Sequence, residues 1–133
     1  MENILNNRRK EPRVKPPLVA RFRNITPLAK HGWDITSIKN ISKSGIMFNV
    51  FQYHKTFSDL ELRLKIPMLR DESVFWGRVV RCSNLALDGM YKLAATLWSG
   101  DEETRAAFNK MMDSLIEKKM RSGAALELQN QQF

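Results

Sequence analysis

The chain has 133 residues, of which 43% are hydrophobic, enough for one domain with a single modest core. Its 22 Lys+Arg against 14 Asp+Glu give a formal net charge of +8, which favours an anionic partner. The single cysteine, Cys82, excludes an internal disulfide, and no apolar run approaches the roughly 18 residues of a membrane span. Residues 1–15 also lack the apolar stretch of a signal peptide, so we expect a cytoplasmic protein.

Residues 1–17 are expected to form a flexible basic leader. Pro12, Pro16 and Pro17 block helix and strand ladders alike. Five basic residues fall within eight positions, namely Arg8, Arg9, Lys10, Arg13 and Lys15. Few apolar side chains accompany them, so we expect a leader that cannot anchor itself by burial and is protease-sensitive until a ligand orders it.

Six strand-like runs follow between residues 18 and 99. They cover residues 18–24, 33–41, 45–51, 60–66, 73–83 and 90–98. In the clearest run, Leu60, Leu62 and Leu64 alternate with charged residues, which is typical of a half-buried strand. Six short strands at hairpin spacing favour a small antiparallel β-barrel over a βαβ fold. We therefore expect a mainly β protein with a six-stranded barrel over residues 18–99.

The last part of the chain predicts an amphipathic helix over residues 100–123. Ser99 and Glu102 fit a capping box at its start, and Gly123 can end it. Apolar residues repeat at helical spacing: Phe108, Met111, Met112, Leu115, Ile116 and Met120. Residues 124–133 are expected to be a polar tail. The stripe predicts packing, either on the barrel or on another copy of the chain.

Two short clusters carry binding chemistry. The first sets Arg9 and Arg13 four positions apart, and a guanidinium fork can bind two phosphate oxygens or the N7 and O6 edge of guanine. The second is a turn that offers Asn40 and Ser42 as short polar groups and Gly45 as a bare backbone for close approach. Either cluster alone is common, as a basic tail or an ordinary hairpin turn. Their conjunction is more specific.

In this order, the clusters resemble the RxxxR and D/N-x-S-x-x-G motifs of the PilZ domain, the bacterial receptor module for cyclic di-GMP. The resemblance covers residues 7–99 approximately. It implies a PilZ-like β-barrel with a C-terminal helix and cyclic di-GMP as the ligand. We expect no cofactor, and no metal site, because Cys82 has only His31 and His54 to help it. The resemblance also implies ligand contacts from Arg9, Arg13, Asn40, Ser42 and Gly45, although aspartate is more frequent than asparagine at the Asn40 position. In the family, the leader wraps over the ligand.

Two further residues are candidates for the ligand site. Arg8 can neutralise additional phosphate charge, which matters if an intercalated pair of ligands binds rather than one. Trp76 can provide a stacking wall for a guanine, or it can pack under the C-terminal helix. Strand alternation places it on one face with Val74, Arg78 and Val80, and places Phe75, Gly77, Val79 and Arg81 on the other.

We expect a binding module and not an enzyme. Neither His31 nor His54 has a Ser/Asp or Cys/Asp constellation in the sequence, and no paired carboxylates suggest bond cleavage. The expected function is a receptor that binds cyclic di-GMP between leader and barrel and signals to a protein partner or a second copy by ordering the leader. Two alternatives stay open: a basic barrel that binds nucleic acid, although no DNA is expected, and a PilZ-like assembly scaffold without a ligand.

Overall fold

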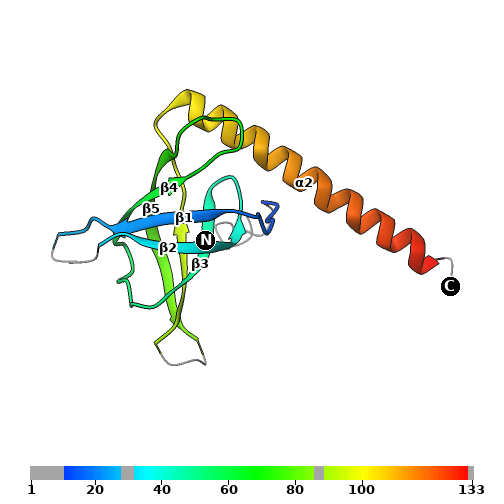
Figure 1. The fold of residues 1–133 in the computed structure, drawn as a ribbon. Helices are drawn as coiled ribbons and strands as arrows, with labels where there is room; N and C mark the ends of the chain where they lie inside the picture. The colour runs from blue at the N-terminus through cyan, green and yellow to red at the C-terminus, as the bar shows by residue number, and fades with distance from the viewer. Residues whose placement is uncertain (1–10, 28–31, 86–88, 132–133) are drawn as a thin grey trace, which may run out of the picture.

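The computed structural model describes residues 11–27, 32–85 and 89–131, with side chains as far as residue 122. Within these ranges the elements are β1 (Val19–Asn24), β2 (Asp34–Ile41), β3 (Gly45–Val50), β4 (Asp59–Leu64), β5 (Ser73–Asn84), β6 (Tyr91–Thr96) and α2 (Glu102–Gln131). The strands close into an antiparallel barrel in the order β1-β2-β3-β6-β5-β4. Figure 1 shows the barrel with α2 leaving it as a long arm. The predicted fold class is confirmed.

Apolar side chains from all six strands fill the barrel interior. On β4, Leu60, Leu62 and Leu64 are fully buried, as the alternation of this strand predicts. Aromatic rings occupy the centre, where Phe22 and Phe48 lie 4.8 Å apart between ring centroids. Because inward positions are taken up by the core, a ligand site has to lie on the outer surface of this barrel.

Helix α2 packs on the barrel of its own chain. Phe108 and Met112 are buried, and the Phe108 ring contacts Phe75 of β5 at 5.3 Å between centroids. The cap differs from the prediction, because Asp101 and not Ser99 directly precedes the first helical residue. The Asp101 carboxylate accepts hydrogen bonds from the backbone N–H of Thr104 at 2.9 Å and from its hydroxyl at 2.7 Å.

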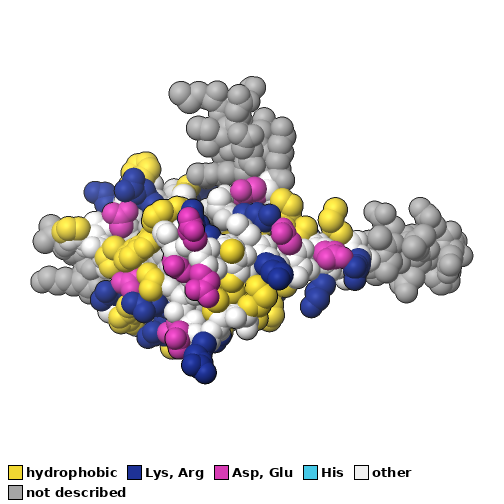
Figure 2. Space-filling view, turned by 90° about the horizontal axis from the view of Figure 1, so that it is seen from above, with side chains coloured by type: hydrophobic (Ala, Val, Ile, Leu, Met, Phe, Trp, Pro, Cys, Tyr) yellow, Lys and Arg dark blue, Asp and Glu magenta, His cyan; other side chains and the backbone are white. Residues whose placement is uncertain are grey.

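The predicted end of the helix at Gly123 is wrong, since α2 runs on to Gln131. Strong helix formers follow the glycine, and their summed propensity outweighs the cost of about 1 kcal/mol for one helical glycine. The expected tail at 124–133 is therefore helical as far as residue 131. Figure 2 shows the arm with lysine, arginine and acidic side chains along it. Among the described residues no helix is both long enough and apolar enough to cross a membrane.

Two β-bulges interrupt the alternation of the barrel. Lys39 is the extra residue in β2 against β3, and Val80 is the extra residue in β5 against β6. An extra residue reverses the faces of the residues that follow it. As a result Arg81, predicted to share a face with Val79, is exposed on the outside whereas Val79 is buried, and that prediction is wrong. The bulges thus decide which polar side chains reach the outer surface.

Gly77 is predicted to be the residue at which the barrel is least tolerant of a side chain. A Cβ there would lie 2.5 Å from the backbone oxygen of Thr96 and 3.0 Å from Leu62. We expect Gly77→Ala to lower the free energy of unfolding by about 1–3 kcal/mol in urea denaturation, the usual cost of overpacking. Gly32→Ala is the control, because nothing lies within 4 Å of its Cβ position. Equal, small effects of both substitutions would contradict this close approach.

Candidate functional site

A row of four residues crosses the outer face of the barrel. The strand register pairs Asn40 of β2 with Met47 of β3, Met47 with Ala94 of β6, and Ala94 with Arg81 of β5. The two bulges stand next to the two ends of this row and turn its polar ends outward. Asn40 and Arg81 are thereby separated by three strand spacings, about 14 Å, over a floor made by Met47 and Ala94.

A cavity of about 750 Å³ lies over this row. Its volume falls within the range of small-molecule sites, roughly 300–1,000 Å³. The cavity brings together four of the predicted site residues, Arg13, Asn40, Ser42 and Gly45. Arg8 and Arg9 lie outside the described residues. The two sequence clusters, far apart along the chain, therefore meet at one surface through Arg13.

The turn between β2 and β3 gives the site its second cluster. The backbone N–H of Ser42 donates to the carbonyl of Gly45 at 2.9 Å, which closes a two-residue turn. Gly45 has no positive φ, and a Cβ there would lie 3.4 Å from the Ser42 hydroxyl, an ordinary contact distance. The turn therefore requires no glycine-only backbone conformation at position 45. What the glycine provides is space, because a longer side chain at position 45 would extend beside Ser42 in the cavity.

The second half of the leader is docked on the barrel. Val14 is only 4% exposed, and it forms an antiparallel bridge with Ile41, with N–O distances of 3.0 and 2.9 Å. The expectation that the leader cannot anchor itself is therefore wrong for residues 11–17. A buried valine and two backbone hydrogen bonds at the end of β2 hold it, and Pro16 is buried as well. This bridge also carries Arg13 to the edge of the cavity.

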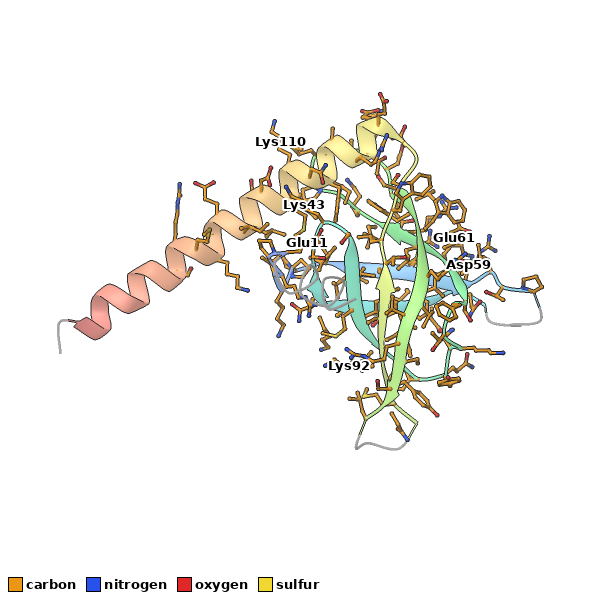
Figure 3. The ribbon with its side chains drawn as sticks, turned by 180° about the vertical axis from the view of Figure 1, so that it is seen from behind. Glu11, Lys43, Asp59, Glu61, Lys92 and Lys110 are labelled. Carbon is orange, nitrogen blue, oxygen red and sulfur yellow. The ribbon has the colours of Figure 1, made fainter. Side chains whose placement is uncertain are left out.

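Glu11 ties the leader to the turn. Its Oε2 accepts hydrogen bonds from the hydroxyls of Ser42 at 3.2 Å and Ser44 at 2.5 Å. Figure 3 shows Glu11 beside Lys43 of the same turn, beneath α2. An acidic side chain thus stands among the polar groups of the cavity.

Helix α2 contacts both halves of the site. Lys119 Nζ donates to the backbone oxygen of Arg13 at 2.6 Å, and Lys43 Nζ lies 2.8 Å from Asp113 Oδ1. The first contact bears on the leader and the second on the turn. The helix is therefore connected to the two segments whose positions shape the cavity.

Trp76 is not brought to the other site residues. It lies on the outer face of β5, 41% exposed, opposite Glu61 of β4, and its backbone exchanges hydrogen bonds with Trp98 at 2.6 and 2.8 Å. It does not line the cavity. Figure 3 shows Glu61 on the other side of the barrel from Glu11. A stacking role for Trp76 at this cavity has no support from its position.

Sequence reasoning missed two charged residues of the cavity, Arg81 and Glu11. Arg81 was hidden because a bulge leaves no mark in the pattern of alternation. Glu11 drew no attention because it is one acidic residue in a basic leader, although its place between Arg9 and Arg13 is visible in the sequence. Of the two histidines, His54 is buried beside Asn24 and His31 lies outside the described residues. The described part of the chain holds no group of three potential metal ligands.

The structure is similar to three solved proteins in particular. It matches K. pneumonia MrkH in its c-di-GMP complex with a TM-score of 0.66 at 16% identity, over 85% of this chain and 53% of that one. It matches the PilZ domain of YcgR from Escherichia coli with c-di-GMP at 0.58 and 16% identity, over 89% and 98%. The fold is PilZ-like. Bacillus subtilis MotI/DgrA, an inhibitor of motility, matches at 0.58 and 14% identity, over 87% and 51%.

At these identities the similarity concerns the PilZ-like fold. The chain spans about half the length of MrkH and MotI/DgrA, and nearly all of the YcgR PilZ domain. No protein-family model matches the sequence, and no curated protein matches it. The similar structures thus identify the fold of the barrel and helix. The ligand has to be inferred from the residues that line the cavity.

Docking of the leader through Val14 can be tested by proteolysis. Val14→Ser should weaken the docking by about 1.5 kcal/mol and speed trypsin cleavage after Arg13 roughly tenfold, since cleavage follows the population of the open segment. Each rate is divided by that of the denatured chain, because position 14 borders the cleaved bond. Val19→Ser, at a site 54% exposed, is the matched control and should change nothing. Rapid cleavage of the unaltered protein would disprove the docking.

Proposed function

We propose that this chain is a cytoplasmic receptor that binds cyclic di-GMP in the cavity over the row from Asn40 to Arg81. It acts as a binding module and not as an enzyme. The observation that carries the proposal is the meeting of Arg13, from the first sequence cluster, with Asn40, Ser42 and Gly45, from the second, at one cavity. Two of the similar structures, MrkH and the YcgR domain, are described with c-di-GMP, which supports the choice of ligand.

The residues of the cavity have complementary roles toward such a ligand. The Arg13 guanidinium can bind phosphate oxygens or the N7 and O6 edge of a guanine in a bidentate pair. The Asn40 amide oxygen can accept from guanine N–H groups, and the Ser42 hydroxyl can donate or accept. Arg81, at the far end of the row, can hold a second phosphate or base across the small side chain of Ala94. We assign Arg8 and Arg9 to the same ligand from the leader side.

We propose that the signal passes through the leader and α2 to a protein partner or a second copy of the chain. The support is the bond from Lys119 of α2 to the Arg13 carbonyl, together with the contact of Lys43 with Asp113. A ligand that engages Arg13 acts on a segment whose backbone is held by the helix. Residues 11–17 are already docked on the barrel without a ligand. The ligand therefore changes the contacts that the leader makes with the ligand and with α2, and not the docking itself.

A nucleic-acid surface has less support than a dinucleotide site. Arginines on the outer face of the barrel are matched by carboxylates, with Arg21 on Glu72 and with Arg23 and Arg63 on Glu61. Burial raises the pKa of Glu61, but the hydrogen bonds from the two arginines outweigh it and bring the pKa below its ordinary value. That carboxylate therefore stays charged at neutral pH and offsets the basic face. We propose no DNA binding, and the cavity argues against a scaffold without a ligand.

Calorimetric titration with cyclic di-GMP tests the proposal directly. We expect saturable binding, and much weaker binding of cyclic di-AMP and GTP. Adenine has no O6 acceptor, so the bidentate contact from an arginine fails. The same titration gives the number of ligands per chain. Equal affinity for cyclic di-AMP would exclude guanine recognition, and no heat from either ligand at two well-separated temperatures would exclude the receptor.

Substitution of the two cavity arginines is a second test. Arg13→Ala and Arg81→Ala should each weaken binding by about 1.5–3 kcal/mol, roughly 10- to 150-fold, the range for hydrogen bonds to charged groups. Arg78→Ala is the matched control, because Arg78 lies on the same strand as Arg81 but bonds Asp59, away from the cavity. An equal loss in the Arg78 variant would indicate general charge attraction in place of a defined site.

A further inference from the structure

One contact in the cavity joins two parts of the proposed site to each other. Glu11 Oε2 accepts from Ser42 Oγ at 3.2 Å and from Ser44 Oγ at 2.5 Å. Ser42 is only 7% exposed, and its remaining contact is a long one, 3.5 Å, to the Gly45 carbonyl. The Glu11 carboxylate of the leader therefore accepts hydrogen bonds from both hydroxyl groups of the turn. One of the two belongs to Ser42, a residue of the second sequence cluster.

A hydroxyl group has a single proton to donate. While Ser42 donates to Glu11, it has no proton for a ligand. The Glu11 carboxylate is also an anion that lines the cavity, and phosphate groups entering the cavity would be repelled by it. An anionic ligand and the Glu11 carboxylate therefore compete for the Ser42 proton and repel one another at this turn.

We infer that Glu11 is an internal competitor of the ligand, which has to leave the turn before an anionic nucleotide binds there. The inference rests on the proposed function. Pro12 stiffens the backbone between Glu11 and Arg13, which keeps the two side chains on one short segment beside the cavity. The bridge of Val14 to Ile41 keeps the leader attached while this exchange takes place.

Such a competitor sets the concentration at which the receptor responds. The apparent dissociation constant equals the intrinsic one divided by the fraction of molecules in which the site is open. If Glu11 holds the turn in about 90% of the molecules, binding is weakened roughly tenfold. The leader thus supplies both the Arg13 guanidinium, which contacts the ligand, and the Glu11 carboxylate, which competes with it. Glu11 and Arg13 are two positions apart in the sequence.

Calorimetry on two single variants tests the competition from both sides of the contact. Glu11→Gln removes the charge, and Ser44→Ala removes a hydroxyl that binds Glu11 but is not part of the D/N-x-S-x-x-G motif. Both should bind cyclic di-GMP more tightly, by about 3- to 10-fold, the equivalent of one net hydrogen bond. The double variant should gain less than the sum of the two, because both substitutions break one interaction.

The control is Glu72→Gln, which changes the net charge equally but removes a carboxylate bound to Arg21 and not part of the cavity. Its affinity should equal that of the unaltered protein. Weaker or unchanged binding by both Glu11→Gln and Ser44→Ala would overturn the inference. Weaker binding would indicate that Glu11 contacts guanine N–H groups of the ligand. Unchanged binding would indicate that the contact of Glu11 with Ser42 and Ser44 does not affect the affinity.

A readout without ligand separates this inference from the proposed function. Amide exchange at Ile41 and Val14 should become faster in Glu11→Gln and Ser44→Ala, and stay unchanged in Glu72→Gln, if the carboxylate fastens the leader. Failure of all variants to bind cyclic di-GMP would refute the proposed function and the competition for that ligand together. Faster exchange would then still show Glu11 as the clasp of the leader, and unchanged exchange would remove that role as well.

Discussion

The site depends on the loss of regular pairing at two positions of an otherwise closed barrel. A six-stranded barrel fills its interior with side chains, so strict alternation would send some polar residues of β2 and β5 inward. The extra residues Lys39 and Val80 reverse the faces locally and bring Asn40 and Arg81 outside. An uncompensated polar group in the core costs several kcal/mol, so the same bulges protect the core and create the polar ends of the row.

The remaining parts of the cavity come from segments that the barrel alone does not position. The leader reaches it because Val14 pairs with the end of β2, and the turn is tied to the leader by Glu11. Each contact is small, and each lies between segments of one chain. Because the leader supplies both Arg13 and Glu11, one segment brings a cation and an anion to the same cavity.

Local patterns predicted what depends on neighbouring residues alone. The leucines at 60, 62 and 64 identify their strand because side chains alternate on any strand. The bulge at Val80 could not be predicted, since an extra residue is defined only against the partner strand. Gly123 wrongly suggested the end of the helix, because the unfavourable helix propensity of one glycine is smaller than the favourable propensity of the residues after it. The two clusters pointed to Arg13, Asn40, Ser42 and Gly45, which line one cavity, but not to Arg81 at the far end of the row or to Glu11 beside Ser42.

The contact of Lys119 with the Arg13 carbonyl gives α2 the geometry of a lever. Of the described side chains of α2, the last that pack against the core are Leu115 and Ile116, and Lys119 lies roughly 4.5 Å beyond Ile116 along the helix axis. The last helical residue, Gln131, is roughly 22 Å beyond Ile116. A rigid helix that pivots at Ile116 would therefore convert a displacement of 1 Å at Lys119 into one of about 5 Å at its tip.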